Sequence, residues 1–217
     1  MNINKLIDHT LLRTDATISD IRQLCKDAIK HDFVSVCVSP VYVPLAVEYL
    51  QDHETKVGTT VGFPIGAVSP EMKYAETRFV IHQGAEEVDM VINVGALKDG
   101  NLDLIKRETG QVVEAADGNC VKIIIETCLL TNEEKVTVCN IAKTMGAHFV
   151  KTSTGFSIKG ATAEDVRLMR KTVGKEMGVK ASGGINTLSD LNTMVTAGAN
   201  RIGTSSAIAI LSELKSE

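Results

Sequence analysis

Short apolar runs rich in Val and Ile alternate along the chain with longer segments in which apolar residues recur every three or four positions. Short continuous apolar runs are typical of strands buried on both faces, and the longer spacing is typical of amphipathic helices. A brief alternating stretch at 6–12 predicts one further strand. The apolar runs span residues 33–39, 56–63, 87–95, 121–127, 148–153, 178–184 and 200–206.

Segments with the boundary signals of helices lie between these runs. Thr131 followed by Glu134 is a capping-box pattern, and Gly146 stands where that helix should stop. The same order, a Thr in front and a glycine behind, recurs in later segments. The predicted helical segments are 17–32, 70–85, 131–147, 162–174 and 187–199. In the second of them, the spacing predicts a shared apolar face made of Met72, Ala75, Phe79 and Val80.

The alternation of strands with helices indicates βαβ units and a parallel sheet. Eight strands about one βα unit apart favour an α/β fold, a single (β/α)₈ TIM barrel, as one domain over 1–217. An open doubly wound sheet is the alternative. That fold is expected to have a Gly-rich loop after its first strand, and the sequence DHTLLRTDAT at 8–17 offers none.

Composition narrows the classes of function. The chain has 217 residues, a formal net charge of −4 and no basic run, which argues against nucleic acid or a membrane surface as partner. Trp is absent and aromatic residues make up only 4%, so a platform for stacking bases is not expected. Five cysteines without a C-x-x-C pair, and no apolar leader, predict reduced thiols and a cytoplasmic location.

Charged residues occur inside the predicted strands. Asp89 alternates with the apolar Val88 and Met90, so we expect Asp89 to point into the barrel and its neighbours to face the helices. The same alternation points Lys151 and Lys180 inward. Ions buried without partners are costly, so these groups must pair or titrate.

Two interpretations of this inward set are open. It could be a salt-bridge network that only supports the barrel, a role that fits Lys122 and Glu126 in particular. Alternatively, two neighbouring lysines disfavour each other's charge, so Lys180 would lower the pKa of Lys151 and make it nucleophilic near pH 7. A neutral lysine amine attacks carbonyl carbons and forms a Schiff base.

Two glycine-containing turns follow the last two predicted strands, SGG at 182–184 and GTSS at 203–206. Barrels often bind phosphate at the corresponding loops, because backbone N–H groups approach closely and helix N-termini favour anions. Either turn alone is weak evidence, but together they predict a phosphate site.

These residues carry a resemblance that covers essentially the whole chain. The sequence resembles the deoxyribose-phosphate aldolase family, which implies a (β/α)₈ barrel and reversible cleavage of 2-deoxy-D-ribose 5-phosphate to D-glyceraldehyde 3-phosphate and acetaldehyde. It also implies no metal or organic cofactor. The motifs that carry the resemblance are IDHTLL, EVDMVINVGALKDG, KIIIETCLL, VKTSTGF, VKASGGI and RIGTSS.

The resemblance implies a role for each central residue. Lys151 matches the Schiff-base lysine, Lys180 the second lysine that assists proton transfer, and Asp89 the proton donor and acceptor. The resemblance and the strand-end positions together predict substrate contacts at Asp8, Thr10, Cys37, Thr152, Thr154, Gly155, Gly183, Gly184, Gly203, Ser205 and Ser206.

The expected partners are small-molecule phosphosugar and aldehyde substrates, with a homodimer as the candidate assembly. Three alternatives stay open from the sequence. Another Schiff-base aldolase would use Lys151 on a different phosphosugar, and a non-catalytic phosphosugar-binding barrel would share only the two glycine turns. A metal-dependent aldolase would need a ligand cluster, and the five histidines are scattered along the chain.

Overall fold

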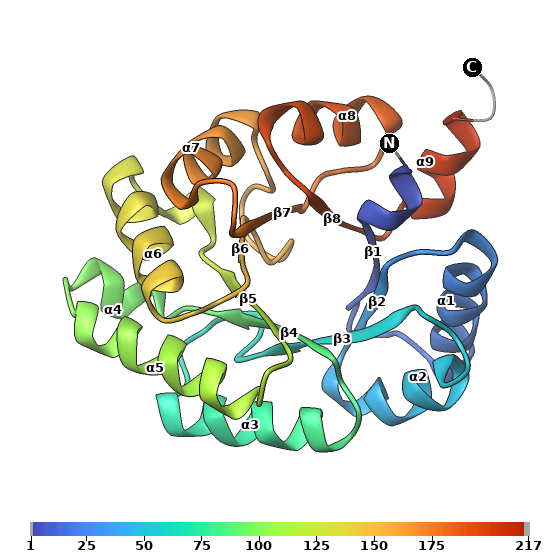
Figure 1. Ribbon diagram of the computed structural model, residues 1–217, viewed down its shortest axis with the longest axis horizontal. Helices are drawn as coiled ribbons and strands as arrows, with labels where there is room; N and C mark the ends of the chain where they lie inside the picture. The colour runs from blue at the N-terminus through green and yellow to red at the C-terminus, as the bar shows by residue number, and fades with distance from the viewer. Residues whose placement is uncertain (1, 215–217) are drawn as a thin grey trace.

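The computed structural model describes residues 2–214 and shows eight parallel strands closed into a barrel, with helices around the outside (Figure 1). The strands follow one another around the barrel in sequence order, and β8 pairs with β1 to close it. The strands are β1 (Ile7–Leu11), β2 (Ser35–Val38), β3 (Lys56–Val61), β4 (Glu87–Val91), β5 (Cys120–Ile124), β6 (Phe149–Lys151), β7 (Gly178–Ser182) and β8 (Arg201–Thr204).

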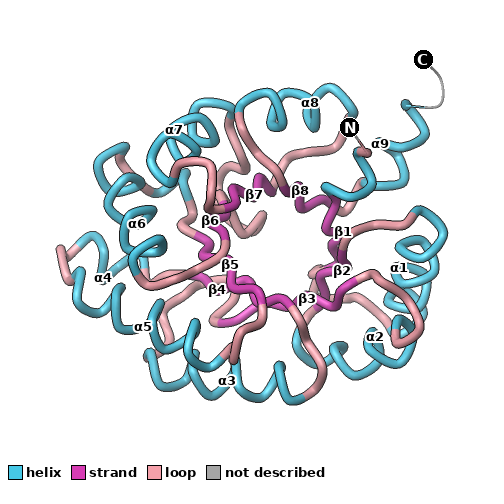
Figure 2. The backbone as a smooth tube through the Cα atoms, in the orientation of Figure 1, coloured by secondary structure: helices cyan, strands magenta, loops and turns pink. Residues whose placement is uncertain are grey.

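The helices form an outer layer around the ring of strands (Figure 2). Most of the apolar core lies between the two layers, where outward-facing strand residues such as Val88 and Ile123 meet the helices. The α-helices are α1 (Ile18–His31), α2 (Val43–Leu50), α3 (Pro70–His82), α4 (Val94–Lys98), α5 (Leu102–Ala115), α6 (Asn132–Thr144), α7 (Ala163–Val173), α8 (Leu188–Ala197) and α9 (Ala207–Leu214). Short 3₁₀ turns occur at Ile3–Leu6, Pro40–Tyr42 and Thr127–Leu129.

All eight predicted strands and all five predicted helical segments are present, with the ends trimmed by a few residues. The capping box at Thr131 and Glu134 is confirmed, and Gly198 ends α8 in the left-handed conformation. The sequence analysis missed α2, α4, α5 and α9. Helix α2 has no side-chain cap, and the inward face of α5 carries the polar Glu108 and Thr109, which hide its apolar periodicity.

The predicted apolar face of α3 is wrong. Met72 and Phe79 are 61% and 59% exposed, Ala75 is also exposed, and only Val80 is buried. The helix instead turns the charged side chain of Lys73 inward, where it is fully buried. A pattern of apolar residues could not predict a helix face that is built around a buried ion.

That ion ties α3 to its neighbours. The Nζ atom of Lys73 donates to Glu108 of α5 at 2.6 Å and to the backbone oxygen of Val91 at 2.7 Å. The other carboxylate oxygen of Glu108 accepts the N–H of Asn93 at 2.8 Å. A buried ion is tolerated where its hydrogen-bonding capacity is met in this way. The pair anchors the end of β4 to the helix layer.

His9 links folding stability to pH. Its ring is buried on the outer side of β1, 5.2 Å from the ring of Phe33, and its Nδ1 atom has no hydrogen-bond partner. Burial lowers the pKa of His9 from its ordinary 6.5 to about 4. Below about pH 6.5, His9 therefore binds a proton in the unfolded chain but stays neutral in the folded chain. The free energy of unfolding consequently falls as the pH drops below about 6.5.

We expect this residue to remove about 2 kcal/mol of unfolding free energy between pH 7.5 and pH 5. Urea denaturation of the wild type and of His9→Gln at both pH values measures it. The variant should lose less stability on acidification than the wild type. Equal losses in the two proteins would show that His9 does not carry this dependence.

Within residues 2–214, no helix combines the length and the apolar character that crossing a membrane requires.

Candidate active site

The strand register brings the predicted central residues together inside the barrel. Lys151, the last residue of β6, is paired in register with Lys180 of β7. Asp89 of β4 is paired in register with Lys122 of β5. Strand parity therefore predicted the inward direction of these side chains correctly, and all of them are at most 2% exposed.

Asp89 is the common hydrogen-bond acceptor of three lysines. Its Oδ2 atom accepts from the Nζ atoms of Lys151 and Lys180, each at 2.8 Å. Its Oδ1 atom accepts from Nζ of Lys122, also at 2.8 Å. Burial alone would raise the pKa of Asp89, but the three lysines around its carboxylate hold that pKa well below its ordinary range.

Asp8 is a second buried carboxylate that pairs with cations of the barrel interior, next to Asp89. Its carboxylate pairs with Lys180 and with Arg201 of β8, the latter at 2.6 Å, and it accepts the hydroxyl of Ser35 at 2.7 Å. Lys122 lies farther from Asp8, at 3.9 Å. Asp8, which the sequence placed near the substrate, therefore lies beneath the site and binds the second lysine.

The two lysines differ in their electrostatic surroundings. The pKa of Lys151 is lowered, first by burial and then by Lys180, against the opposing effect of Asp89. The pKa of Lys180 is raised, because Asp8 and Asp89 together outweigh the effect of burial. The direction predicted from the sequence for Lys151 agrees with this result, although burial rather than Lys180 is the larger cause. Of these two lysines, Lys151 therefore gives up its proton more readily.

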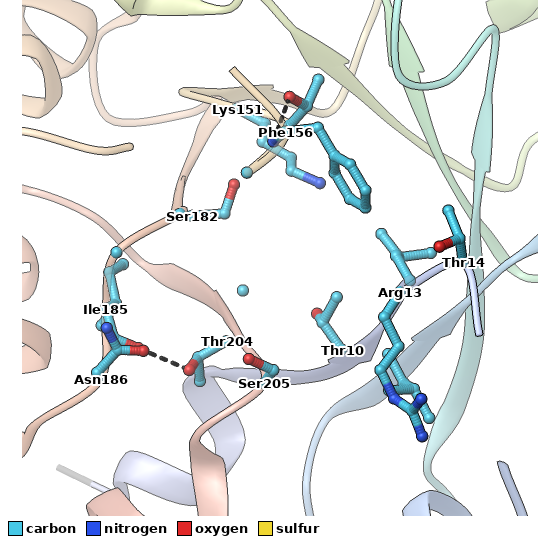
Figure 3. A pocket seen from close by; sticks show the side chains of 17 residues that line it. Thr10, Arg13, Thr14, Lys151, Phe156, Ser182, Ile185, Asn186, Thr204 and Ser205 are labelled. Atoms are coloured by element: carbon cyan, nitrogen blue, oxygen red, sulfur yellow. Dashed lines mark hydrogen bonds between the residues drawn. The ribbon is translucent and has the colours of Figure 1, made fainter. Parts of the chain in front are cut away.

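A cavity of about 420 Å³ opens at the C-terminal ends of β1, β6, β7 and β8, and the Lys151 side chain forms part of its wall (Figure 3). The loop after each of these strands contributes residues. The wall is made of Thr10, Leu11, Leu12, Arg13, Thr14, Lys151, Thr154, Gly155, Phe156, Ser182, Gly183, Gly184, Ile185, Asn186, Gly203, Thr204 and Ser205.

The turn after β7 exposes backbone to this cavity. Gly183 and Gly184 have φ values of 83° and 76°, which favour glycine, and a Cβ atom at Gly184 would meet nothing within 4 Å. Gly203 of β8 is required for packing, since a Cβ there would lie 2.9 Å from Cε of Lys180. Figure 3 shows Ser205 on the cavity wall and the guanidinium of Arg13 turned away, where it pairs with Asp15.

Several predicted substrate contacts do not reach the cavity wall. Thr152 is fully buried, and its hydroxyl donates to the backbone oxygen of Ser182 at 3.2 Å. The hydroxyl of Ser206 donates to Asn186 at 3.0 Å, and its N–H donates to the hydroxyl of Thr204. Both hydroxyls therefore already donate a hydrogen bond within the protein. Cys37 is also absent from the cavity wall and is only 2% exposed.

Thr154 reaches the wall, but its polar groups are engaged. Its hydroxyl donates to Glu126 at 2.5 Å, and its N–H points at the same carboxylate at 3.3 Å. The hydroxyl oxygen also accepts the N–H of Phe156 at 3.0 Å. Glu126, whose role the sequence left open, thus holds the turn that presents Gly155 and Phe156 to the cavity.

Sequence reasoning missed two charged residues of the interior. Glu87 lies two positions before Asp89 and so shares its inward face, and Arg201 alternates with the outward Ile202. Extending the parity argument by two residues on β4, and applying it to β8, would have identified both. It would not have identified their contact, because they are far apart in the chain.

A parallel barrel with a buried, paired lysine beneath a cavity at the strand ends is the arrangement of a barrel enzyme with a lysine-centred site. Residues 3–212 match the DeoC/LacD family of aldolases. The chain therefore belongs to this family of carbon–carbon lyases.

Curated relatives and solved structures agree with this assignment. A deoxyribose-phosphate aldolase of Streptococcus gordonii is 56% identical over 97% of this chain and 96% of its own length. One from a Geobacillus species is 57% identical over 97% of this chain and 95% of its own. A tetrameric deoxyribose phosphate aldolase structure from Aeropyrum pernix superposes with a TM-score of 0.91 at 34% identity, covering 99% of this chain and 91% of that one.

Proposed function

We propose that this chain cleaves 2-deoxy-D-ribose 5-phosphate reversibly to D-glyceraldehyde 3-phosphate and acetaldehyde, through a Schiff base on Lys151. The names of the curated relatives support the substrate. The observation that carries the mechanism is the position of Lys151, at the cavity wall, with a lowered pKa and its Nζ atom 2.8 Å from Asp89.

The reaction begins with the amine of Lys151. Its lone pair attacks C1 of the open-chain sugar to give a carbinolamine, and loss of water leaves a protonated iminium. Acetaldehyde carries C1 and C2, so the bond that breaks is C2–C3. Its electron pair moves into the iminium and forms an enamine, while the C3 hydroxyl loses its proton and becomes the aldehyde of the second product. Protonation of the enamine at C2 and hydrolysis release acetaldehyde and restore Lys151.

We assign the proton transfers to Lys180 and Asp89. Lys180 has a raised pKa and starts as the ammonium, which can protonate the departing hydroxyl of the carbinolamine. The resulting amine can then accept the proton of the C3 hydroxyl. Oδ2 of Asp89 lies 2.8 Å from the Nζ atoms of both Lys151 and Lys180, so it holds the two amino groups next to each other during these transfers.

The phosphate of the substrate is assigned to the turns after β7 and β8. Gly183, Gly184 and Ser205 line the cavity there, and α9 begins two residues after Ser205. Backbone N–H groups and a helix N-terminus favour an anion. Lys151 stands on the other side of the cavity in Figure 3, which leaves room for the sugar between the two ends.

We expect Ser205→Ala to raise KM for 2-deoxyribose 5-phosphate by about 10-fold or more, because a hydrogen bond to a charged group is worth about 1.5–3 kcal/mol. Cleavage of unphosphorylated 2-deoxyribose should change far less. Ser206→Ala is the matched control, because the Ser206 hydroxyl already bonds Asn186, and it should leave both substrates nearly unaffected. Equal losses for both substrates in Ser205→Ala would place the phosphate elsewhere.

Product identification separates this function from its nearest alternatives. Incubation with 2-deoxyribose 5-phosphate should yield acetaldehyde and glyceraldehyde 3-phosphate in equal amounts. An aldolase specific for a different phosphosugar would leave this substrate intact, and a non-catalytic barrel would bind it without products.

We further propose that the enzyme acts in the cytoplasm as a homodimer. All five cysteines are free, which fits a reducing compartment. The exposed Met72 and Phe79 of α3 offer apolar area for a second copy. Sedimentation equilibrium tests the assembly, and a monomer at micromolar concentration would contradict it.

A further inference from the structure

Six charged side chains form a closed ring inside the barrel. Lys151 is not a member of this ring but is hydrogen-bonded to one of its members, Asp89. Cations and carboxylates alternate around this charge ring. Its members, in order of contact, are Lys122, Glu87, Arg201, Asp8, Lys180 and Asp89.

One half of the charge ring lies at the base of the barrel. Lys122 lies 2.6 Å from Glu87, and Glu87 lies 3.0 Å from Arg201. Arg201 continues to Asp8 at 2.6 Å, and its guanidinium also covers the ring of Phe149, 5.2 Å from the centroid. Glu87 and Arg201 are the first residues of β4 and β8, at the end of the barrel opposite the cavity.

The other half lies beneath the cavity. Asp8 pairs with Lys180, and Lys180 lies 2.8 Å from Asp89. Asp89 returns to Lys122 at 2.8 Å, which closes the charge ring. Apart from Arg201, whose side chain is 11% exposed, the side chains of the ring are at most 2% exposed.

The charge ring is neutral as it stands, because its three cations balance its three carboxylates. Lys151 is a fourth cation, and its only ion-pair partner among the described residues is the Oδ2 atom of Asp89, which Lys180 already occupies. A protonated Lys151 would therefore leave one net positive charge buried in the barrel. Such a charge costs several kcal/mol in a protein interior, whereas the free amine costs none of this.

We propose that Glu87 and Arg201 are positioning residues for the nucleophile: by closing the charge ring as a neutral unit, they leave Lys151 as the free amine. Neither residue lines the cavity, so they act through the other ring members. This inference deepens the proposed Schiff-base function and rests on it.

The other titratable groups that face Lys151 do not change this count of buried charges. Asp89 of β4 and Lys180 of β7 belong to the ring and are already counted. Cys37 of β2 also faces Lys151, but burial raises the pKa of its thiol to about 11, so it carries no charge at neutral pH.

The test is the pH dependence of imine formation in four proteins. Acetaldehyde and sodium cyanoborohydride trap the imine on Lys151, and its rate rises with pH as the amine loses its proton. Arg201→Gln leaves the charge ring with one negative charge, so the rising limb should move to higher pH by about one unit. Glu87→Gln leaves one positive charge, and the limb should move to lower pH by a similar amount.

The double variant Arg201→Gln/Glu87→Gln restores a neutral ring, and its profile should return close to that of the wild type. A role in packing alone would lower the trapping rate in each variant without moving the limb in opposite directions. Shifts of the same sign, or unshifted limbs, would overturn the inference. Circular dichroism establishes that each protein is folded, and if Arg201→Gln is not, Glu87→Gln and the double variant still give the test.

The failures of the two proposals are distinguishable. If the wild type forms no reducible adduct on Lys151, the proposed function is wrong. If the wild type is trapped at Lys151 and the variants keep its pH profile, the proposed function stands and the role of Glu87 and Arg201 is wrong.

Discussion

A Lys151→Ala variant is expected to lose cleavage of 2-deoxyribose 5-phosphate by about four orders of magnitude or more, because no covalent intermediate can form without the amine. The fold should persist. Removal of Lys151 leaves Asp89 still paired with Lys180 and Lys122, so no buried carboxylate is orphaned. The coupled assay for glyceraldehyde 3-phosphate measures the loss, and circular dichroism measures the fold.

Lys159→Ala is the matched control for that experiment. Lys159 is an exposed lysine in the loop that follows β6, eight residues beyond Lys151, and its replacement should leave kcat within about two-fold of the wild type. A Lys151→Ala protein that keeps more than about a hundredth of the wild-type kcat would show that another group is the nucleophile.

An Asp89→Asn variant is expected to lose both activity and stability. The interior would hold three lysines and Arg201 against only two carboxylates, and the loss of one partner from a buried ion network costs about 3–5 kcal/mol. The kcat should fall by about 10²–10⁴, because the group that aligns the two active-site lysines for proton transfer is gone. Denaturant titration and steady-state kinetics measure the two effects.

Asp52→Asn removes one negative charge from an exposed position, so it controls for the change in net charge alone. It should be neutral in both measurements. If Asp89→Asn keeps wild-type stability, the interior charges are not balanced as the ion pairs indicate. If it keeps wild-type kcat, Asp89 has no part in proton transfer.

The sequence predicts the barrel and its centre because both follow from short-range patterns. Strand parity fixes which way Asp89 and Lys180 point, and the regular spacing of strands fixes their neighbours. Helix caps such as Thr131 are local signals, and the structure confirms them. Once a parallel barrel is accepted, lysines at adjacent strand ends must meet.

The features that the sequence did not predict depend on contacts between residues far apart in the chain, which a local pattern does not contain. Arg201 meets Asp8 across 193 positions of the chain, and only closure of the barrel by β8 and β1 brings them together. The burial of Lys73 on α3 depends on Glu108 of a different helix. The hydroxyl of Thr154 donates to Glu126, which lies 28 positions earlier in the chain, and only side-chain positions reveal this contact.

The most direct test of the account is the identity of the residue that binds the substrate covalently. The wild-type protein is reduced with sodium borohydride in the presence of acetaldehyde, digested, and mapped by mass spectrometry. The account predicts one ethylated lysine, Lys151, and no label at that peptide in Lys151→Ala. A protein that stays unlabelled while it cleaves the substrate, or a label on Lys180 or Lys122 instead, would contradict it.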